Sequence, residues 1–129
     1  MKCFVSGRSS NFAEIVRVTQ LLRDHGHEIT HDWTVLPLVK PYHEHPEEAG
    51  KYAGLQLKGI ADADVCIFLA HYDGTGLFAE LGAALMLAQK DSKPKVFAIA
   101  DEIPEAMFHY HPAIQWKKDI ETVLIELHG

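Results

Sequence analysis

The stretch that most restricts how this 129-residue chain can fold is Ala63–Ala88. It begins with the apolar run Val65–Ala70, which is too short for a stable helix and typical of a strand buried on both faces. The next residues, His71–Gly76, hold an Asp-Gly pair and a further glycine, and predict a turn. From Leu77 the apolar residues recur every three or four positions, as on one side of a helix. This order of strand, turn and helix is the unit with which α/β folds place ligands at the carboxyl ends of their strands.

The rest of the chain repeats the alternation of strands and helices. Short apolar runs predict four more strands, at Lys2–Ser6, His27–Thr34, Lys95–Ala100 and Ala113–Trp116. Helical spacing predicts three more helices, at Phe12–His25, Glu47–Ala61 and Lys118–Leu127. The alternation favours a three-layer α/β/α sandwich with a five-stranded parallel sheet, flavodoxin-like or Rossmann-like. The length predicts that residues 1–129 form a single domain.

Local signals mark the ends of these helices. Ser10 or Asn11 is the expected N-cap of the first helix, and Gly26 its C-terminal stop. Pro46 fits the first position of the second helix.

Composition excludes several classes of function. The net charge of −6 leaves no basic stripe for a nucleic-acid polymer, although a local cluster of amides and one arginine can still hold a small anion. Cys3 and Cys66 fall in predicted interior strands, as expected of buried thiols in a reducing compartment. No signal peptide or long apolar run is visible, which predicts a cytoplasmic protein that does not contact a membrane. The nine histidines lack metal-binding spacing, so we expect no metal and no other cofactor, although His31 and His71 lie at strand ends.

Glu80 is the most conspicuous polar residue, because it lies among small residues in an almost uncharged part of the predicted helix. If Glu80 lies in the first turn, its carboxylate interacts favourably with the helix dipole, which stabilises the helix by roughly 0.3–1 kcal/mol. This interpretation needs no ligand. Alternatively, the small neighbours leave open space for a ligand beside the carboxylate. Gly82 favours this second interpretation, since glycine inside a helix costs about 1 kcal/mol relative to alanine.

Two loops are candidates for the rest of a binding site. Gly7–Asn11, after the first strand, can cradle a phosphate with backbone N–H groups and Arg8, or it can be only a capped turn. Val35–Pro46 is long enough to form a functional rim or lid. Trp33 and Tyr42 can stack on a planar base or pack against that rim. We expect a ligand where the turns after the first and third strands meet.

Four pieces of the chain together resemble a known superfamily. They are Phe4–Arg8, Gly26–Asp32, Ile60–Val65 and Glu80–Ala84. The spacing between the Ala-Asp-Val piece and the Glu-Leu-Gly piece is the most specific of these features. The pattern, which covers roughly Met1–Ala100, is similar to the nucleoside 2-deoxyribosyltransferase-like superfamily, which includes the 2′-deoxynucleoside 5′-phosphate N-hydrolases.

The resemblance implies roles for particular residues. In that superfamily the glutamate of the E-x-G motif attacks the anomeric carbon of a nucleoside, which implies that Glu80 is the nucleophile. The superfamily's loop after the first strand holds the 5′-phosphate, which implies binding by Ser6, Gly7, Arg8 and Ser9. A polar residue in the turn before the glutamate touches the sugar or phosphate, and Asp73 and Thr75 are the candidates, beside Gly74 and Gly76.

The chain departs from the superfamily pattern at Gln56. Enzymes of the superfamily carry an aspartate there, eight residues before the position of Asp64, which assists the departing base. A glutamine can hydrogen-bond but cannot transfer a proton near neutral pH. Either Asp73 or Asp32 then supplies the acid, or the protein binds nucleotides without efficient turnover.

We therefore predict an N-glycosidase or deoxyribosyl transferase that acts on a nucleoside or its 5′-monophosphate. The alternative is a nucleotide-binding or sensing module of the same fold without turnover. The superfamily works as dimers or larger rings, which implies a homodimer or higher homo-oligomer. The apolar segments Val35–Leu38 and Met107–Tyr110 offer surface for the second copy.

Overall fold

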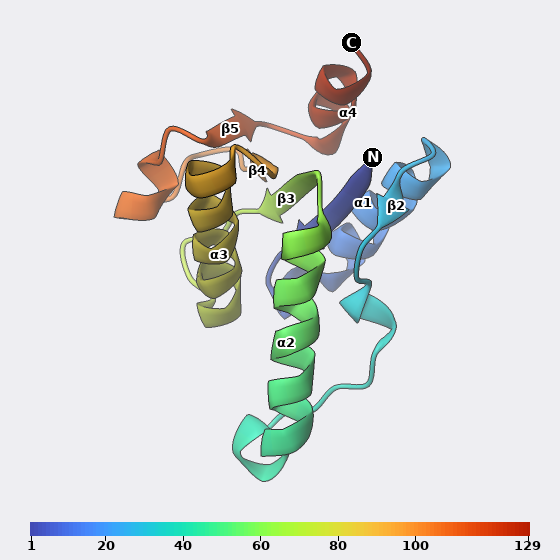
Figure 1. The fold of residues 1–129 in the computed structure, drawn as a ribbon, viewed down its shortest axis with the longest axis vertical. Helices are drawn as coiled ribbons and strands as arrows, with labels where there is room; N and C mark the ends of the chain where they lie inside the picture. The colour runs from blue at the N-terminus through green and yellow to red at the C-terminus, as the bar shows by residue number, and fades with distance from the viewer.

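The computed structural model describes residues 1–129 as a five-stranded parallel sheet between two pairs of helices (Figure 1). The strands are β1 (Lys2–Ser6), β2 (Glu28–Ile29), β3 (Val65–Leu69), β4 (Lys95–Ile99) and β5 (Ile114–Lys117). The helices are α1 (Phe12–Asp24), α2 (Pro46–Asp62), α3 (Thr75–Asp91) and α4 (Ile120–His128). The sheet order is β2-β1-β3-β4-β5, and every neighbouring pair is parallel. The predicted three-layer α/β/α sandwich is confirmed.

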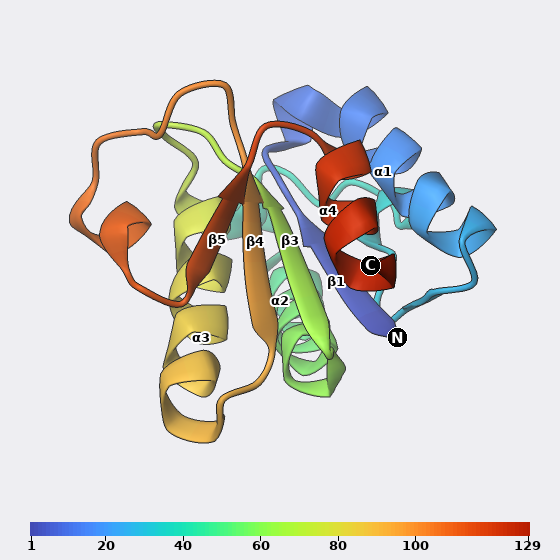
Figure 2. The same ribbon diagram turned by 90° about the horizontal axis from the view of Figure 1, so that it is seen from above.

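Helices α1 and α4 cover one face of the sheet, and α2 and α3 cover the other (Figure 2). Each face carries its own apolar core. Successive strand residues point to opposite faces, so Val65 and Ile67 pack towards α1 and α4, whereas Cys66 and Phe68 pack towards α2 and α3. All five residues of β3 are buried, as expected for a central strand covered on both faces. The two cysteines are free and buried, and burial raises the pKa of the Cys3 thiol to about 11.

The predicted second strand, His27–Thr34, is wrong in length, because only Glu28 and Ile29 pair with β1. β2 is an edge strand with one neighbour. Beyond it the backbone turns into a 3₁₀ helix at Trp33–Val35, whose first turn is capped by the Asp32 side chain. The local hydrogen bond of an aspartate therefore ends the strand that alternation alone would continue.

The helix ends agree only in part with the predictions. Gly26 adopts a positive φ of 85°, and Pro46 is the first residue of α2, so both of these signals are confirmed. Asn11 takes the N-cap position of α1, but neither it nor Ser10 makes the expected capping bond. α3 begins at Thr75, directly after Gly74 (φ 118°), so Glu80 is in the second turn of α3 and not in the first.

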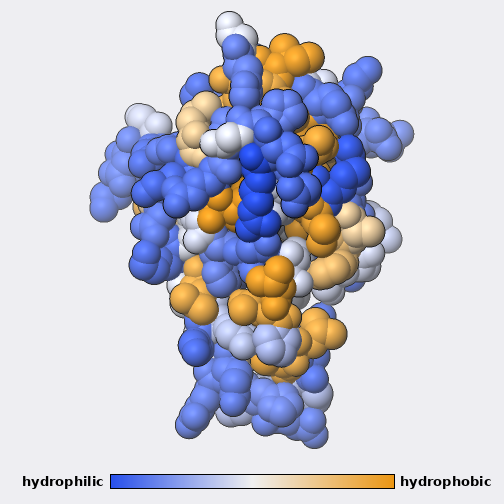
Figure 3. All heavy atoms as spheres, turned by 90° about the vertical axis from the view of Figure 1, so that its right-hand side faces the viewer, coloured by the Kyte–Doolittle hydropathy of each residue, from blue (hydrophilic) through white to orange (hydrophobic).

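Helix α2 extends beyond the sheet at its N-terminal end, together with the segment that precedes it (Figure 1). Of its 17 residues only Gly59 and Ile60, near the C-terminal end, are buried. Apolar atoms gather on the side of this projection (Figure 3). Among the apolar residues of α2 and of the segment before it, Leu38 is 86% exposed and Leu57 is 51% exposed. No helix in the chain is both long enough and apolar enough to cross a membrane.

Candidate active site

A cleft of about 670 Å³ opens between α2, the segment before it and the start of α3. Glu80 lies in its wall, on α3. Other side chains that line the cleft are those of Ser9, His31, Trp33, Leu38, Tyr42, Gln56, Leu57 and Thr75. β1 ends at Ser6 and β3 at Leu69, so the cleft lies at the carboxyl edge of the parallel sheet, where α/β folds bind ligands.

Ser6 holds one oxygen of the Glu80 carboxyl. Its hydroxyl donates a hydrogen bond of 2.7 Å to Glu80 Oε2. Ser6 is the last residue of β1, two positions after Phe4, so the two-residue period of the strand turns both side chains towards α2 and α3. The Ser6 side chain is fully buried, which fixes the direction of this donor.

Gln56 holds the other oxygen. Its side-chain Nε2 donates a hydrogen bond of 3.0 Å to Glu80 Oε1. The residue comes from α2, one turn before the buried Gly59, where α2 packs against α3. The two carboxyl oxygens of Glu80 are therefore oriented by neutral donors from two different elements.

No lysine or arginine neutralises Glu80, since none of the ion pairs in the structure includes it. Burial raises the pKa of the Glu80 carboxyl from 4.5 to about 7, although the hydrogen bonds from Ser6 and Gln56 act in the opposite direction. At neutral pH the side chain is therefore divided between its acid and its carboxylate. A carboxylate that is poorly hydrated, oriented and open to a cleft can act as a nucleophile or as a base.

The loops after β1 and β3 meet beside this cleft. Arg8 forms an ion pair of 2.7 Å with Asp73, which also lies 2.9 Å from His71. Gly74 permits this contact, because a Cβ atom there would lie 2.9 Å from the Arg8 side chain. A smaller pocket of about 290 Å³ opens at the junction, lined by Arg8, Ser10, Asn11 and His71 and by the end of β3.

The structure brings most of the predicted site residues together. Those that line the cleft are Ser9, Trp33, Gln56, Thr75, Gly76 and Glu80. Arg8, Asp73 and Gly74 form the neighbouring junction, and Gly7 lies against α1, where a Cβ would meet Ile15 at 3.0 Å.

Asp32 does not line the cleft. It pairs with Arg23 at 3.1 Å and accepts hydrogen bonds from the amide and hydroxyl of Thr34. These hydrogen bonds and the Arg23 guanidinium lower the pKa of the Asp32 carboxyl, although burial opposes them. In this arrangement Asp32 fixes the loop after β2.

The sequence interpretation missed one wall of the cleft. It comes from the exposed half of α2, with Ala49, Gly50, Tyr52, Ala53 and Leu57. The apolar spacing of α2 is equally consistent with packing on the sheet, so only the projection of the helix shows that this side faces the cleft. The sequence marks His31 only by its position at a predicted strand end, and the structure places it in the cleft wall.

The fold resembles that of a known enzyme. The structure of Clostridium botulinum CMP N-glycosidase, BcmB, matches with a TM-score of 0.61 over 99% of this chain and 98% of that chain, at 15% sequence identity. At this level of identity the match shows a shared fold over nearly the whole length of both chains. No protein-family model and no curated protein matches the sequence. No group of three or more His, Cys, Asp or Glu side chains is arranged to hold a metal ion.

Proposed function

We propose that this chain is an N-glycosidase that acts on a nucleoside or nucleoside 5′-monophosphate, with Glu80 as the nucleophile. The observation that carries the proposal is the Glu80 carboxyl itself, which lines a cleft, has no basic partner and is oriented by Ser6 and Gln56. The fold shared with a CMP N-glycosidase supports the same class of substrate.

The reaction proceeds in two displacements. Glu80 attacks C1′ of the sugar, the C1′–N bond breaks, and the bonding electron pair leaves with the base. The resulting glycosyl ester is resolved by water, which gives a free sugar or sugar phosphate, or by a second base, which gives a transferase reaction. Ser6 keeps the carboxylate directed during the first step, because it donates to the oxygen that Gln56 does not hold.

Arg8 is the proposed phosphate ligand. It lies over Gly74, at the N-terminus of α3, where no side chain caps the first N–H groups. A phosphate in this position gains a guanidinium and helix N–H donors at once. It displaces Asp73 from Arg8, and the freed Asp73 carboxylate then becomes available to hold a sugar hydroxyl or a proton.

The second candidate is a nucleotide-binding module without turnover. Gln56 favours it, because a neutral amide lies where a carboxylic acid would assist the departing base. The cleft and the Arg8 junction serve this function equally well, so only a measurement of bond cleavage separates the two candidates.

The test is base release from a panel of ribo- and deoxyribonucleosides and their 5′-monophosphates, followed by chromatography. We expect Glu80→Gln to lower kcat/KM by about 1,000-fold or more, since the nucleophile is lost while its shape remains. Glu105→Gln removes the same charge from an exposed loop and serves as the control. Tight binding of a monophosphate without any release by the unchanged protein would favour the binding module instead.

We further propose that two copies associate through the exposed apolar residues of the segment Val35–Leu38. Val35 and Leu38 are 76% and 86% exposed. Sedimentation should show a dimer that Leu38→Glu dissociates, whereas Ile125→Glu, on exposed α4 surface, leaves it intact. A monomeric parent protein would contradict the proposal.

A further inference from the structure

Three buried side-chain polar atoms in the structure have no hydrogen-bond partner, and two of them belong to residues of the cleft. They are Nε2 of His31 and Oε1 of Gln56; the third, Nδ1 of His109, is elsewhere. Such atoms are rare in folded proteins, because each costs about 1–3 kcal/mol when it is left unpaired. Two in one cleft indicate that a ligand supplies the missing partners.

The position of His31 is fixed by the residues on either side of it. The Thr30 hydroxyl donates to the Gly59 carbonyl of α2 at 2.8 Å, and Asp32 is held by Arg23 and Thr34. His31 also packs closely on Gly59, where a Cβ would come within 2.9 Å of the His31 Cβ. The backbone is therefore anchored while the buried Nε2 is left without a partner, and pairing with a molecule in the cleft requires the ring to rotate so that this atom faces the cleft.

The orientation of the Gln56 amide is fixed in the same way. When Glu80 is ionised, as the proposed attack requires, the Gln56 Nε2 must face it, because a carboxylate accepts hydrogen bonds and does not donate them. Oε1 is consequently the free end of the amide, and it can only accept. The cleft thus contains a fixed acceptor on Gln56, an uncommitted imidazole on His31, and the proposed nucleophile next to Gln56.

We propose that His31 and Gln56 form the subsite of the departing base, in which His31 donates an N–H to the base as the C1′–N bond breaks and Gln56 accepts an N–H from its amino group. This inference rests on the proposed function. The substrate class is accordingly a nucleotide whose base carries an exocyclic amino group next to a ring or carbonyl acceptor, as in cytosine and adenine.

The chemistry requires no proton from His31. Burial lowers the pKa of His31, so the ring is neutral at pH 7 and carries one N–H. As Glu80 forms its bond to C1′, the electron pair of the C1′–N bond moves onto the base, and the His31 N–H stabilises the developing negative charge. The base then takes its proton from water, and His31 is unchanged.

The test compares two leaving groups on the full chain. One is a cytosine nucleotide, and the other is the corresponding 4-nitrophenyl glycoside 5-phosphate, whose phenolate departs without assistance. We expect His31→Phe, which keeps the ring but removes both nitrogens, to lower kcat/KM about 100-fold on the nucleotide. On the nitrophenyl substrate the change should stay within about threefold, since no donor is needed there. His31→Gln restores an N–H donor and should recover at least about a tenth of the lost activity on the nucleotide.

Other outcomes separate this inference from the proposed function. Equal losses on both substrates would show that His31 only supports the fold of the cleft, and an unchanged rate would show that it has no role; either overturns the inference and leaves Glu80 as nucleophile. If the parent protein cleaves neither substrate, the proposed function and the inference fail together. The Gln56 acceptor has its own test, since we expect at least about a tenfold preference for CMP over UMP and for AMP over IMP. Equal rates on each pair would overturn that part.

Discussion

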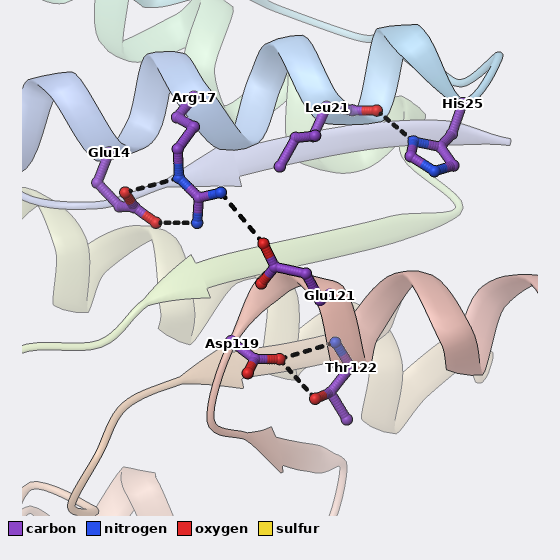
Figure 4. Close-up of polar contacts among 7 residues, drawn as sticks. All are labelled: Glu14, Arg17, Leu21, His25, Asp119, Glu121 and Thr122. Carbon is purple, nitrogen blue, oxygen red and sulfur yellow. Dashed lines mark hydrogen bonds and ion pairs between the residues drawn. The ribbon is translucent and has the colours of Figure 1, made fainter.

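The two sides of the sheet differ in whether their polar side chains have hydrogen-bond or ion-pair partners. On the side of α1 and α4 these groups are paired with one another (Figure 4). Arg17 on α1 donates to Glu14 at 2.8 Å and to Glu121 at the start of α4 at 3.2 Å. Asp119 caps α4 by accepting from the Thr122 amide at 2.8 Å. These contacts join two helices and occupy the donors and acceptors that they use.

The side of α2 and α3 leaves polar groups without partners. It contains the unpartnered atoms of His31 and Gln56, and a carboxyl, Glu80, whose pKa is raised to about 7 by burial. Most of α2 stands away from the sheet. The two sides therefore differ in their polar groups: those on the α1 and α4 side are paired, whereas the α2 and α3 side holds two unpartnered atoms and one carboxyl that is costly to ionise.

The largest effect should come from opening the core on the α1 and α4 side. Phe97 is fully buried there, so Phe97→Ala should lower the free energy of unfolding by about 4 kcal/mol. Leu57→Ala, on the projecting part of α2, should lower it by only about 0.5 kcal/mol. Urea unfolding of the two variants measures the difference. Equal losses would mean that the exposed side of α2 contributes as much to stability as the buried core around Phe97.

Glu80→Gln should have the next largest effect, and it should stabilise the protein. The folded carboxyl has a pKa of about 7 against an ordinary value of 4.5, so ionisation of Glu80 costs about 3 kcal/mol of stability above pH 7. Below pH 4.5 both the folded and the unfolded states are protonated, and the cost is absent. The gain from Glu80→Gln should therefore grow as the pH rises from about 4.5 to about 7 and then level off.

Urea unfolding between pH 4 and pH 9 measures this change, with Glu105→Gln as the exposed control. The control should show no comparable rise with pH. A constant gain at every pH would mean that burial does not penalise the ionised form of Glu80, and would remove the contrast between the two faces.

Arg8→Ala should weaken the binding of a nucleoside 5′-monophosphate by about 10- to 100-fold, because a charge-assisted contact with the phosphate is lost. The affinity for the unphosphorylated nucleoside should change little. Calorimetry in the Glu80→Gln background measures both without turnover. Arg17→Ala removes an arginine from the opposite face and should leave both affinities unchanged; equal weakening of nucleoside and nucleotide by Arg8→Ala would contradict the phosphate assignment.

Asp119→Ala should have the smallest effect, a modest loss of stability near neutral pH. The hydroxyl and amide of Thr122 lower the pKa of the Asp119 carboxyl below 3.8, so its contribution is present above that value and disappears as the pH falls through the lower folded pKa. Thermal unfolding at pH 7 and at pH 2.5 measures the difference. A loss of the same size at both values would show that the ionised cap is not what stabilises α4.

The sequence predicts the middle of the fold well, because β1, β3 and β4 are buried on both faces and their apolar runs have no competing interpretation. The prediction from the sequence is wrong at the edge of the sheet, in the length of β2. β2 has one neighbour, and the side-chain cap of Asp32 overrides the alternation of the predicted eight-residue strand.

In the candidate site, too, the sequence predicts what depends on a local pattern and misses what depends on the packing of separate elements. Glu80 was predictable because an acidic residue among small ones, after a strand and a glycine turn, is a local pattern. Its contact with Gln56 depends on how α2 packs against α3, and the orphaned Nε2 of His31 depends on what every neighbouring element leaves unpaired. Neither the Glu80–Gln56 contact nor the unpaired His31 atom can be predicted from the residue spacing within one segment.

The carboxyl of Glu80 also links the occupancy of the cleft to the surrounding buffer. With a pKa of about 7, the free protein holds roughly half a proton on this group at neutral pH. When a molecule enters the cleft and changes this pKa, the protein takes up or releases a fraction of a proton. Heats of association recorded in phosphate and in Tris should therefore differ by that fraction of the difference between the ionisation enthalpies of the two buffers, and this difference should vanish in Glu80→Gln.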